Sequence, residues 1–480
     1  MEALYESGYY HKIKKKILNR HFVISLTVIL ISSAFILYAM KTYYNKAQSR
    51  TDHFRWDTVA GEEIEVYLSQ NPYVEAIINR LPEFQKKTGI KVNYYIIPEE
   101  YYFDKLSLGF KMFRSPDAFM IGSNYIWKYA DKGYIQDLNT LLNQTQITDP
   151  LYDIEDFYPS VINALKWDTI SGHKTGTGGL WGVPMGFELY SLAYNKRIFR
   201  EEGLKPPETM EQLLELCERL NEFNGKGTYA LALRGSKNWS TITTSYITTY
   251  ANYGAKDFET VDGKLISGVN SSQAVAMTDM WVKLIKAGGA PGWENYNWYK
   301  ASADFGAGKA AMLFDADNAG YYQNYPGESK ESGNIAWVKA PLPEGIKTGT
   351  SNLWTWGLAM NNSSNHKAAT WLFLQYFTSK EYALWASQNF KVVDPARKSI
   401  LESREFEKML RNSEGYAQAL RETINHAEIQ FTPHPYFFEV AAEWSETLQN
   451  IVLGKYHSTQ EGLDELKVKF DNIAKGIYVR

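Results

Sequence analysis

The spacing of apolar and polar residues changes repeatedly along the chain from Glu62 onward. Residues 64–68 alternate in the manner of a half-buried strand. Residues 73–88 then place apolar side chains three and four positions apart, which predicts an amphipathic helix. Gly89 follows at the position where a residue in the left-handed conformation commonly ends a helix. The pattern therefore predicts a strand followed directly by a helix.

Two more segments extend this alternation. Residues 90–97 are rich in β-branched and aromatic side chains, which favours a second strand. Residues 117–122 are short, apolar and bounded by turn residues, as is typical of a buried parallel strand. Strands that alternate with helices predict an α/β layer with right-handed crossover connections.

The rest of the chain begins with the same alternation and ends mostly helical. Residues 191–194 predict a strand, and residues 210–221 predict a helix with Thr209 as its N-cap. Further helices are predicted at residues 368–377, 381–389, 402–411 and 440–452.

The N-terminal part carries a different signal. Residues 22–40 contain no charge, and at 1.5 Å per residue they reach about 28 Å, close to the thickness of a bilayer core. Five basic residues precede this run: Lys12, Lys14, Lys15, Lys16 and Arg20. By the positive-inside rule they stay cytoplasmic, which places the body at the extracytoplasmic face of the cell membrane. We therefore expect residues 1–50 to be a basic tail and an uncleaved membrane anchor, with a cleaved signal peptide or a buried core helix as alternatives.

Charge and composition exclude several classes of protein. The net charge of −3 combines +6 in residues 1–50 with −9 in the remainder, and an acidic body disfavours nucleic acid as a partner. Cys217 is the single cysteine, so a disulfide framework within one chain is excluded. Aromatic residues make up 15% of the chain, and so much aromatic surface needs a core, an interface or a ligand site.

Motifs for catalysis or cofactor binding are missing or incomplete. The eight histidines are scattered and form no HExxH motif. Residues 315–320 are similar to the start of a calcium loop, but Ala319 and Pro326 stand where ligands are required. We therefore expect no cofactor and no metal site. A carboxylate pair for glycoside hydrolysis stays an alternative, because 54 acidic residues make chance pairs common.

Several segments together carry a likeness to a known family. Residues 184–196 read PMGFELYSLAYNK. The other matching segments, in the family's order, are residues 199, 203–204, 206–207, 305–312 and 394–399. On these residues the chain from about Glu62 to its C-terminus resembles the family 1 extracellular solute-binding proteins, the maltose-binding-protein type that feeds carbohydrate ABC importers. Ala193 departs from the pattern, since the family usually has a large apolar residue there.

The resemblance implies a fold. The expected class is α/β, with two lobes of the periplasmic-binding-protein type (type II) joined by hinge crossings and preceded by the membrane-anchor helix. We expect the chain to cross between the lobes near Met185 and again near Asp315. Lobe one then holds residues 60–184 and 316–362, and lobe two holds residues 187–314 and 363–480.

A sugar presents flat C–H faces and rims of hydroxyl groups, which aromatic rings and polar side chains can cover. Loops at the carboxyl ends of strands offer Asn71, Tyr73, Ser123, Asn124 and Tyr125, and the first crossing offers Glu188 and Tyr190. A dense aromatic stretch offers Trp293 and Trp298. By position in the family, Trp239, Asp317 and Asn318 are candidates, and Trp354 and Arg397 complete the set. For each residue, a place in a surface loop or in hinge packing is the alternative, and Arg397 could equally form a salt bridge at the hinge.

The resemblance implies binding without catalysis. We expect a monomer that captures a carbohydrate, and the aromatic content favours an oligosaccharide. The closed form would deliver the ligand to an ABC permease in the membrane, near which the N-terminal helix would hold it. A membrane-anchored sensor and an extracellular glycosidase are the alternative functions, and a peptide, a polyamine or a glycerol phosphate are alternative ligands.

Overall fold

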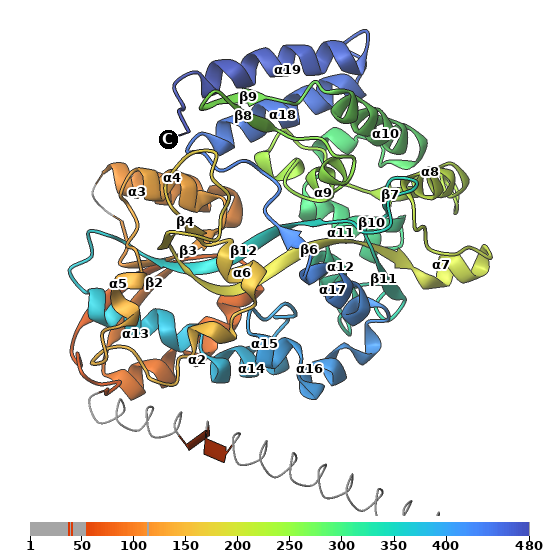
Figure 1. Ribbon diagram of the computed structural model, residues 1–480. Coiled ribbons are helices and arrows are strands. Elements are labelled where there is room, and N and C mark those ends of the chain that lie inside the picture. The colour runs from red at the N-terminus through yellow and green to blue at the C-terminus, as the bar shows by residue number, and fades with distance from the viewer. Residues whose placement is uncertain (1–36, 39, 42–53, 113–114, 480) are drawn as a thin grey trace, which may run out of the picture.

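The computed structural model describes residues 37–38, 40–41, 54–112 and 115–479 (Figure 1). The predicted anchor, residues 22–40, lies almost entirely outside this part of the chain. Among the described residues, no helix has both the length and the apolar character needed to cross a membrane.

One large sheet organises the described strands. Its nine strands run in the order β2-β1-β3-β12-β6-β10-β7, with β11 paired to β6 and β13 paired to β12. These strands are β1 (Glu63–Ser69), β2 (Lys91–Ile97), β3 (Ala118–Gly122), β6 (Val183–Asn195), β7 (Tyr229–Ala232), β10 (Ala310–Ala316), β11 (Ile335–Lys339), β12 (Ser351–Met360) and β13 (Ala427–Glu428). Two small hairpins stand apart, β4 (Lys166–Trp167) with β5 (Gly179–Leu180), and β8 (Phe258–Val261) with β9 (Lys264–Ser267).

Helices cover the sheet and extend beyond it (Figure 1). The described α-helices are α2 (Pro72–Thr88), α3 (Glu99–Lys111), α4 (Tyr125–Asp131), α5 (Asn139–Leu142), α6 (Pro159–Asn163), α7 (Lys196–Glu201), α8 (Met210–Arg219), α9 (Ser245–Asn252), α10 (Ser272–Gly288), α11 (Trp298–Gly306), α12 (Asp317–Asn324), α13 (Lys367–Phe377), α14 (Lys380–Asn389), α15 (Lys398–Leu401), α16 (Arg404–Met409), α17 (Tyr416–Ile424), α18 (Phe437–Val452) and α19 (Thr459–Ala474). Short 3-10 turns lie at η1 (Ile154–Asp156), η2 (Trp239–Thr241), η3 (Trp293–Asn295) and η4 (Leu410–Asn412).

The first helix shows how local sequence sets these boundaries. The side chain of Asn71 accepts a hydrogen bond from the backbone N–H of Tyr73, and Pro72 occupies the first turn of α2, where a missing N–H costs nothing. Gly89 ends the helix with a φ of 68°, as the sequence predicts. Thr209 likewise caps α8, where it forms a capping box with Gln212.

The elements form two lobes. In the first lobe, α2, α3, α4 and α13 pack against the strands β1, β2, β3 and β12. In the second lobe, α8, α10, α11 and α12 pack against β7, β10 or β11, and α17 packs against β11 and β6. Figure 1 shows the first lobe at the lower left and the second at the upper right.

Two long strands belong to both lobes. The first part of β6, up to Leu189, pairs with β12, while its last residues pair with β10 and β11. The last part of β12, from Trp356, pairs antiparallel with β3, while Ser351 and Asn352 pair with β13. The chain therefore passes between the lobes along β6 and, in the opposite direction, along β12.

This arrangement differs in part from the expected lobe boundaries. Met185, near which the first crossing is predicted, lies in β6. Asp315 lies in β10 instead of at a crossing, and α12 remains packed against the second lobe. The return to the first lobe is made by β12, so α13 and α14 pack against α2 there. The difference arises because β10 ends inside the second lobe, whereas β12 pairs with strands of both lobes.

Most predicted elements are confirmed, with two informative differences. The strand predicted at residues 117–122 forms β3, which is parallel to β1 but antiparallel to β12. The helix predicted at residues 402–411 starts later and is shorter, because the side chain of Ser403 accepts a hydrogen bond from the backbone N–H of Phe406 and caps α16, and the 3-10 turn η4 follows α16 directly.

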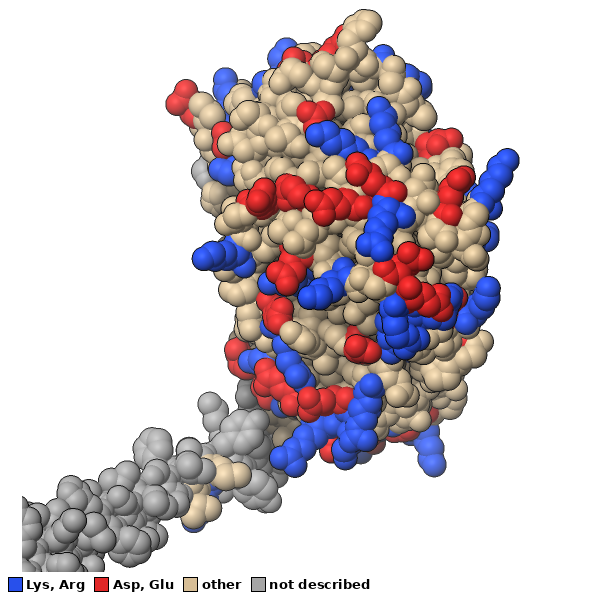
Figure 2. All heavy atoms as spheres, turned by 90° about the vertical axis from the view of Figure 1, so that its right-hand side faces the viewer, with Lys and Arg blue, Asp and Glu red and all other residues tan. Residues whose placement is uncertain are grey.

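Charged side chains are mixed on the face of the second lobe. In Figure 2, lysine and arginine residues alternate with aspartate and glutamate residues over this face. Ion pairs between residues close in the sequence occur on the surface, such as Arg197 with Glu201 and Lys256 with Glu259. This face therefore carries both signs of charge, with one run of neighbouring acidic residues in its upper half.

A close contact between the strands yields a test of the fold. We expect Gly122→Ala to destabilise the protein by about 1–3 kcal/mol, because a Cβ at this position would overlap the ring of Trp354. Urea denaturation followed by circular dichroism measures the change. Gly476→Ala is the matched control, since a Cβ there meets nothing within 4 Å. Equal stability of Gly122→Ala and the wild-type protein would contradict the close approach of Trp354 to β3.

Candidate functional site

A cavity of about 50 Å³ lies between the lobes, beside the strands that cross between them. Its walls come from both lobes and from both crossing strands. The first lobe contributes the loop before α2 and the start of α3, and the second contributes η2, the start of α11 and the junction of β10 with α12. Ends of strands and starts of helices thus converge on one enclosed space, as is usual for ligand sites in α/β folds.

Eight of the fourteen predicted site residues line this cavity. They are Asn71, Tyr73, Glu188, Tyr190, Trp239, Trp298, Asn318 and Trp354. The Nδ2 group of Asn71 is buried and has no hydrogen-bond partner among the described residues, so it can donate to a ligand. The structure thus gathers side chains that are up to 283 positions apart, from Asn71 to Trp354, at one place.

Three predicted residues from the end of β3 lie outside the cavity lining. Ser123 donates from Oγ to Oδ1 of Asn124 at 3.1 Å and accepts from the backbone N–H of Thr355 at 3.3 Å. These bonds fix the end of β3 against β12. Tyr125 packs among other aromatic rings, with Phe103 on one side. The contacts of Ser123 and Tyr125 are structural, while Nδ2 of Asn124 is buried and has no hydrogen-bond partner among the described residues.

The remaining three predicted residues have other partners. Trp293 is 3% exposed and packs against the backbone of Gly235 in the second lobe. The carboxylate of Asp317 accepts from the backbone N–H groups of Leu189 and Asn318, which ties β6 to α12. Asp317 therefore acts beside the cavity without lining it.

Arg397 lies away from the cavity, in a buried position. Its guanidinium is 1% exposed, donates to the backbone carbonyls of Thr378 and Asp153, and lies 3.7 Å from the ring centroid of Phe157. Burial lowers its pKa from the ordinary value. These contacts hold the segment after α14 against the first lobe.

Nine lining residues were missed by the sequence reasoning, and the charged and aromatic ones among them are Glu99, Arg234, Tyr322 and Trp356. Glu99 and Arg234 each follow the end of a strand, so the rule that selected Asn71 could have found them. Trp356 is two residues from Trp354 in one strand, and such residues share a face. Tyr322 follows Asn318 by four positions in α12, which places both on one side of the helix.

The positive charge nearest the cavity is already balanced. Arg234 donates from Nε to Oδ2 of Asp315 at 2.9 Å and from Nη2 to Oδ1 at 2.6 Å. The two side chains are 9% and 1% exposed. Such a bidentate pair in a buried site fixes the guanidinium in place.

Two carboxyl groups face the cavity without such a partner. Glu188 accepts from Nε1 of Trp356 at 3.0 Å, and burial raises its pKa to about 7 although the charge of Arg234 opposes the shift. Glu99 accepts from the hydroxyl of Tyr299 at 3.2 Å, and burial raises its pKa as well. Each carboxylate can accept several further hydrogen bonds, so a ligand rich in hydroxyl donors suits this lining.

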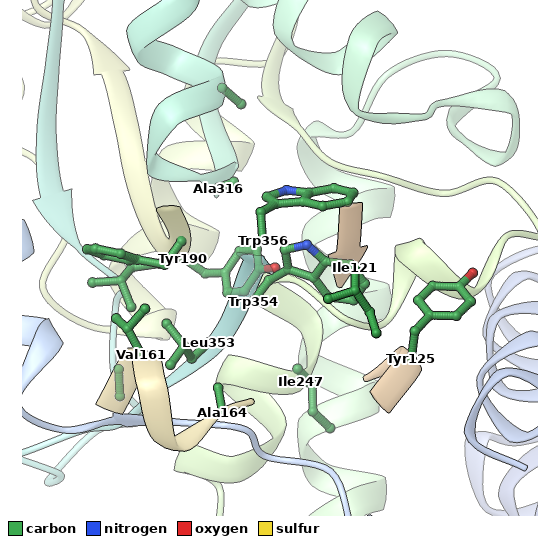
Figure 3. Packing of buried hydrophobic residues seen from close by; sticks show 14 of the residues in the cluster. Ile121, Tyr125, Val161, Ala164, Tyr190, Ile247, Ala316, Leu353, Trp354 and Trp356 are labelled. Atoms are coloured by element: carbon green, nitrogen blue, oxygen red, sulfur yellow. The ribbon is translucent and has the colours of Figure 1, made fainter. Parts of the chain in front are cut away.

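Indole rings form the apolar part of the lining. Trp239 stacks on Trp354 with 5.3 Å between the centroids and 23° between the planes, and Trp354 meets Trp356 edge to face at 5.5 Å. Figure 3 shows Trp354 and Trp356 together at the centre, with Tyr190 on one side and Tyr125 on the other. Flat rings beside carboxylates can cover the C–H faces of a polyhydroxylated molecule while its hydroxyl groups are hydrogen-bonded.

The described residues contain no group of three or more histidine, cysteine, aspartate or glutamate side chains placed to hold a metal ion. The site thus consists of hydrogen-bonding groups and aromatic faces enclosed by two lobes, which is the arrangement of a solute-binding protein. A sequence model of the bacterial extracellular solute-binding proteins matches residues 68–384, and the chain belongs to this family.

Individual relatives agree with this assignment. The chain is 36% identical to an erythritol/L-threitol-binding protein of Mycolicibacterium smegmatis, over 85% of this chain and 86% of the relative. It is 30% identical to a mannitol-binding protein of Pseudomonas aeruginosa, over 55% of this chain and 57% of that protein.

Solved structures agree on the fold. A solute-binding protein of Agrobacterium radiobacter K84 in complex with ribitol superposes with a TM-score of 0.74 at 20% identity, covering 86% of this chain and 99% of that one. A solute-binding protein of Agrobacterium vitis S4 with bound D-mannitol gives the same TM-score at 21% identity, covering 88% and 100%. The predicted two-lobe α/β fold and the predicted class, a solute-binding protein and not an enzyme, are confirmed.

The raised pKa of Glu188 yields a test of the electrostatics of the site. A carboxyl group with a pKa of about 7 in the folded protein and 4.5 ordinarily binds its proton more tightly when folded. The stability of the ligand-free wild type therefore falls as the pH rises from about 4.5 to about 7. Relative to Glu188→Gln, we expect the free energy of unfolding of the wild type to decrease by up to about 3 kcal/mol between pH 5 and pH 8.

Urea titrations at the two pH values measure this difference. Glu405→Gln, at an exposed position of α16, is the matched control and should follow the wild type at both pH values. A constant difference between the wild type and Glu188→Gln over the whole range would contradict the buried environment of this carboxyl group.

Proposed function

We propose that this protein captures a short, uncharged polyol between its two lobes and presents it to an ABC importer in the membrane. The observation that carries the proposal is the enclosed interlobe cavity, in which carboxylates and indole rings converge. The chain itself acts by binding, and the ligand leaves chemically unchanged.

The size of the cavity supports a small ligand. A cavity of about 50 Å³ holds a few waters or a short chain of hydroxylated carbons, but not several sugar rings. The aromatic content led us to expect an oligosaccharide. Several of these rings instead pack on one another at the edge of the cavity, as Trp239 does on Trp354, and this leaves less room for a ligand.

The chemistry of the lining supports a polyol. Glu188 and Glu99 can accept hydrogen bonds from hydroxyl groups, and the Asn71 amide can donate one. A carboxylate or phosphate on the ligand would face these two acidic side chains while Arg234 is already paired with Asp315, which disfavours anions. The names of two relatives, which bind erythritol or L-threitol and mannitol, point to the same class of ligand.

Contacts between the lobes support a cycle of opening and closing. Tyr299 of the second lobe donates to Glu99 of the first, and Lys128 of the first lobe lies 3.6 Å from Glu439 of the second. A ligand can enter only when such contacts are broken, and its own contacts to both lobes then favour their return. The closed form is the one that an importer would recognise.

The family acts outside the cytoplasm, and the N-terminal segment suggests how this protein stays near its importer. We propose that residues 22–40 anchor a monomeric body to the membrane, as their apolar character and the basic residues before them indicate. Anchoring raises the effective concentration of the binding protein at the importer.

A ligand screen on the full chain tests the proposed function. We expect linear polyols of four to six carbons to raise the melting temperature by about 2 °C or more at a hundred times their Kd, because a ligand that binds the folded state stabilises it. Aldonic acids of the same length and maltotriose should produce no shift. Differential scanning fluorimetry measures the shifts, and a response to maltotriose but to no polyol would refute the proposal.

The stacking role of Trp239 allows a separate test. We expect Trp239→Ala to weaken binding of the best polyol at least about tenfold, since the ring lines the cavity and is a stacking face for the ligand. Isothermal titration calorimetry gives the Kd. Tyr101→Ala, at an exposed position of α3, is the control and should bind as the wild type does. Unchanged affinity in Trp239→Ala would rule out this ring as a ligand contact.

A further inference from the structure

One end of the cavity is closed by six aromatic side chains, which we call the aromatic wall: Phe103, Tyr125, Trp239, Trp354, Trp356 and Phe438. Trp239, Trp354 and Trp356 line the cavity, while the other three rings stand behind them. The wall is continuous, because each ring touches at least one other member.

The centre of the wall is a stack of three rings. Tyr125 lies between Phe103, at 3.6 Å and 10° between the planes, and Phe438, at 3.8 Å and 28°. Phe438 also meets Trp239 edge to face at 5.2 Å. Phe438 therefore links the rings that face the cavity to the rings behind them.

The stack is assembled from both lobes. Phe103 and Tyr125 come from α3 and α4 of the first lobe, whereas Phe438 comes from the first turn of α18 in the second lobe. Next to it, the ion pair of Lys128 with Glu439 joins the same two helices, α4 and α18. The stack of Tyr125 on Phe438 is thus a contact that exists only when the lobes are together.

Phe438 stands behind the end of the cavity that Trp239 forms. Trp239 lines the cavity, Phe438 packs against its ring, and both side chains are partly exposed. A ligand longer than the cavity would have to push Phe438 away from Tyr125. This would break the stack of Tyr125 on Phe438 and would hold the lobes apart.

We propose that Phe438, by stacking on Tyr125, sets the upper limit on the length of the ligand that this protein can enclose. The inference rests on the proposed function, since it concerns which members of the polyol class the same site accepts. Short linear polyols permit the stack to form and the lobes to close. A polyol that carries an additional sugar ring is excluded by Phe438 and not by a lack of polar groups in the cavity.

The test compares a series of ligands on two proteins. The full-length wild type and Phe438→Ala are titrated with erythritol, ribitol, D-mannitol and maltitol, the last being a hexitol that carries a glucose ring. We expect the wild type to bind the linear polyols and not maltitol. In Phe438→Ala we expect the ratio of the Kd for maltitol to the Kd for the best linear polyol to fall at least tenfold, because the cavity then opens toward solvent past Trp239.

A matched variant separates length selection from a general loss of closure. Glu439→Gln removes the neighbouring ion pair but leaves the wall intact, so it should weaken all ligands by a similar factor and keep the ratio of the wild type. Phe438→Leu retains an apolar side chain of smaller reach and should give an intermediate ratio, and it carries the test should Phe438→Ala fail to fold.

The outcomes discriminate between the two proposals. Suppose that the wild type binds linear polyols and that the ratio of the Kd for maltitol to the Kd for the best linear polyol is the same in both Phe438 variants as in the wild type. This result overturns the length limit and leaves the proposed function intact. A ratio that falls as much in Glu439→Gln as in Phe438→Ala also overturns it. A wild-type protein that binds no member of the series overturns the proposed function and, with it, the length limit.

Discussion

The structure depends on the backbone ladder between β6 and β12. These antiparallel strands pair from Leu353 with Leu189 to Leu358 with Val183, and each continues into a different lobe. A backbone-to-side-chain hydrogen bond reinforces the junction where β6 leaves the ladder, because the backbone N–H of Tyr190 donates to the hydroxyl of Ser351. Two lobes joined by paired strands can change their angle by small backbone rotations while each lobe keeps its own core. The cavity beside this ladder is therefore the place where a change of angle alters the space available to a ligand.

The electrostatics of the cavity follow from burial more than from the total charge. Arg234 and Asp315 neutralise one another, and burial raises the pKa of the carboxyl groups of Glu188 and Glu99. Burial also raises the pKa of Asp317 and of Asp394, which lie close behind the cavity. The buried carboxyl groups therefore favour a neutral ligand with hydroxyl donors over an anionic one, in line with the proposed function.

The aromatic residues serve two purposes in one connected group. Trp239 and Trp354 offer flat faces to the cavity, whereas Tyr125 and Phe438 bring the lobes together. Because Trp239 touches both sets, the ligand site and the contact between the lobes are physically continuous. Under the proposed function, ligand contact and closure of the lobes would be coupled through this group of rings.

The sequence alone determined the local elements, the α/β class and the family. The caps at Asn71 and Thr209 and the apolar spacing of α2 depend on neighbours within a few positions, so they can be read from the chain. The rule on strand ends found Asn71 and could have found Glu99, since it too depends on local order. The tertiary structure decided that β12 is the second crossing strand, that Arg397 is buried away from the ligand, and that Phe438 meets Tyr125. These facts join residues hundreds of positions apart, and no local pattern specifies which distant partners meet when the two lobes pack together.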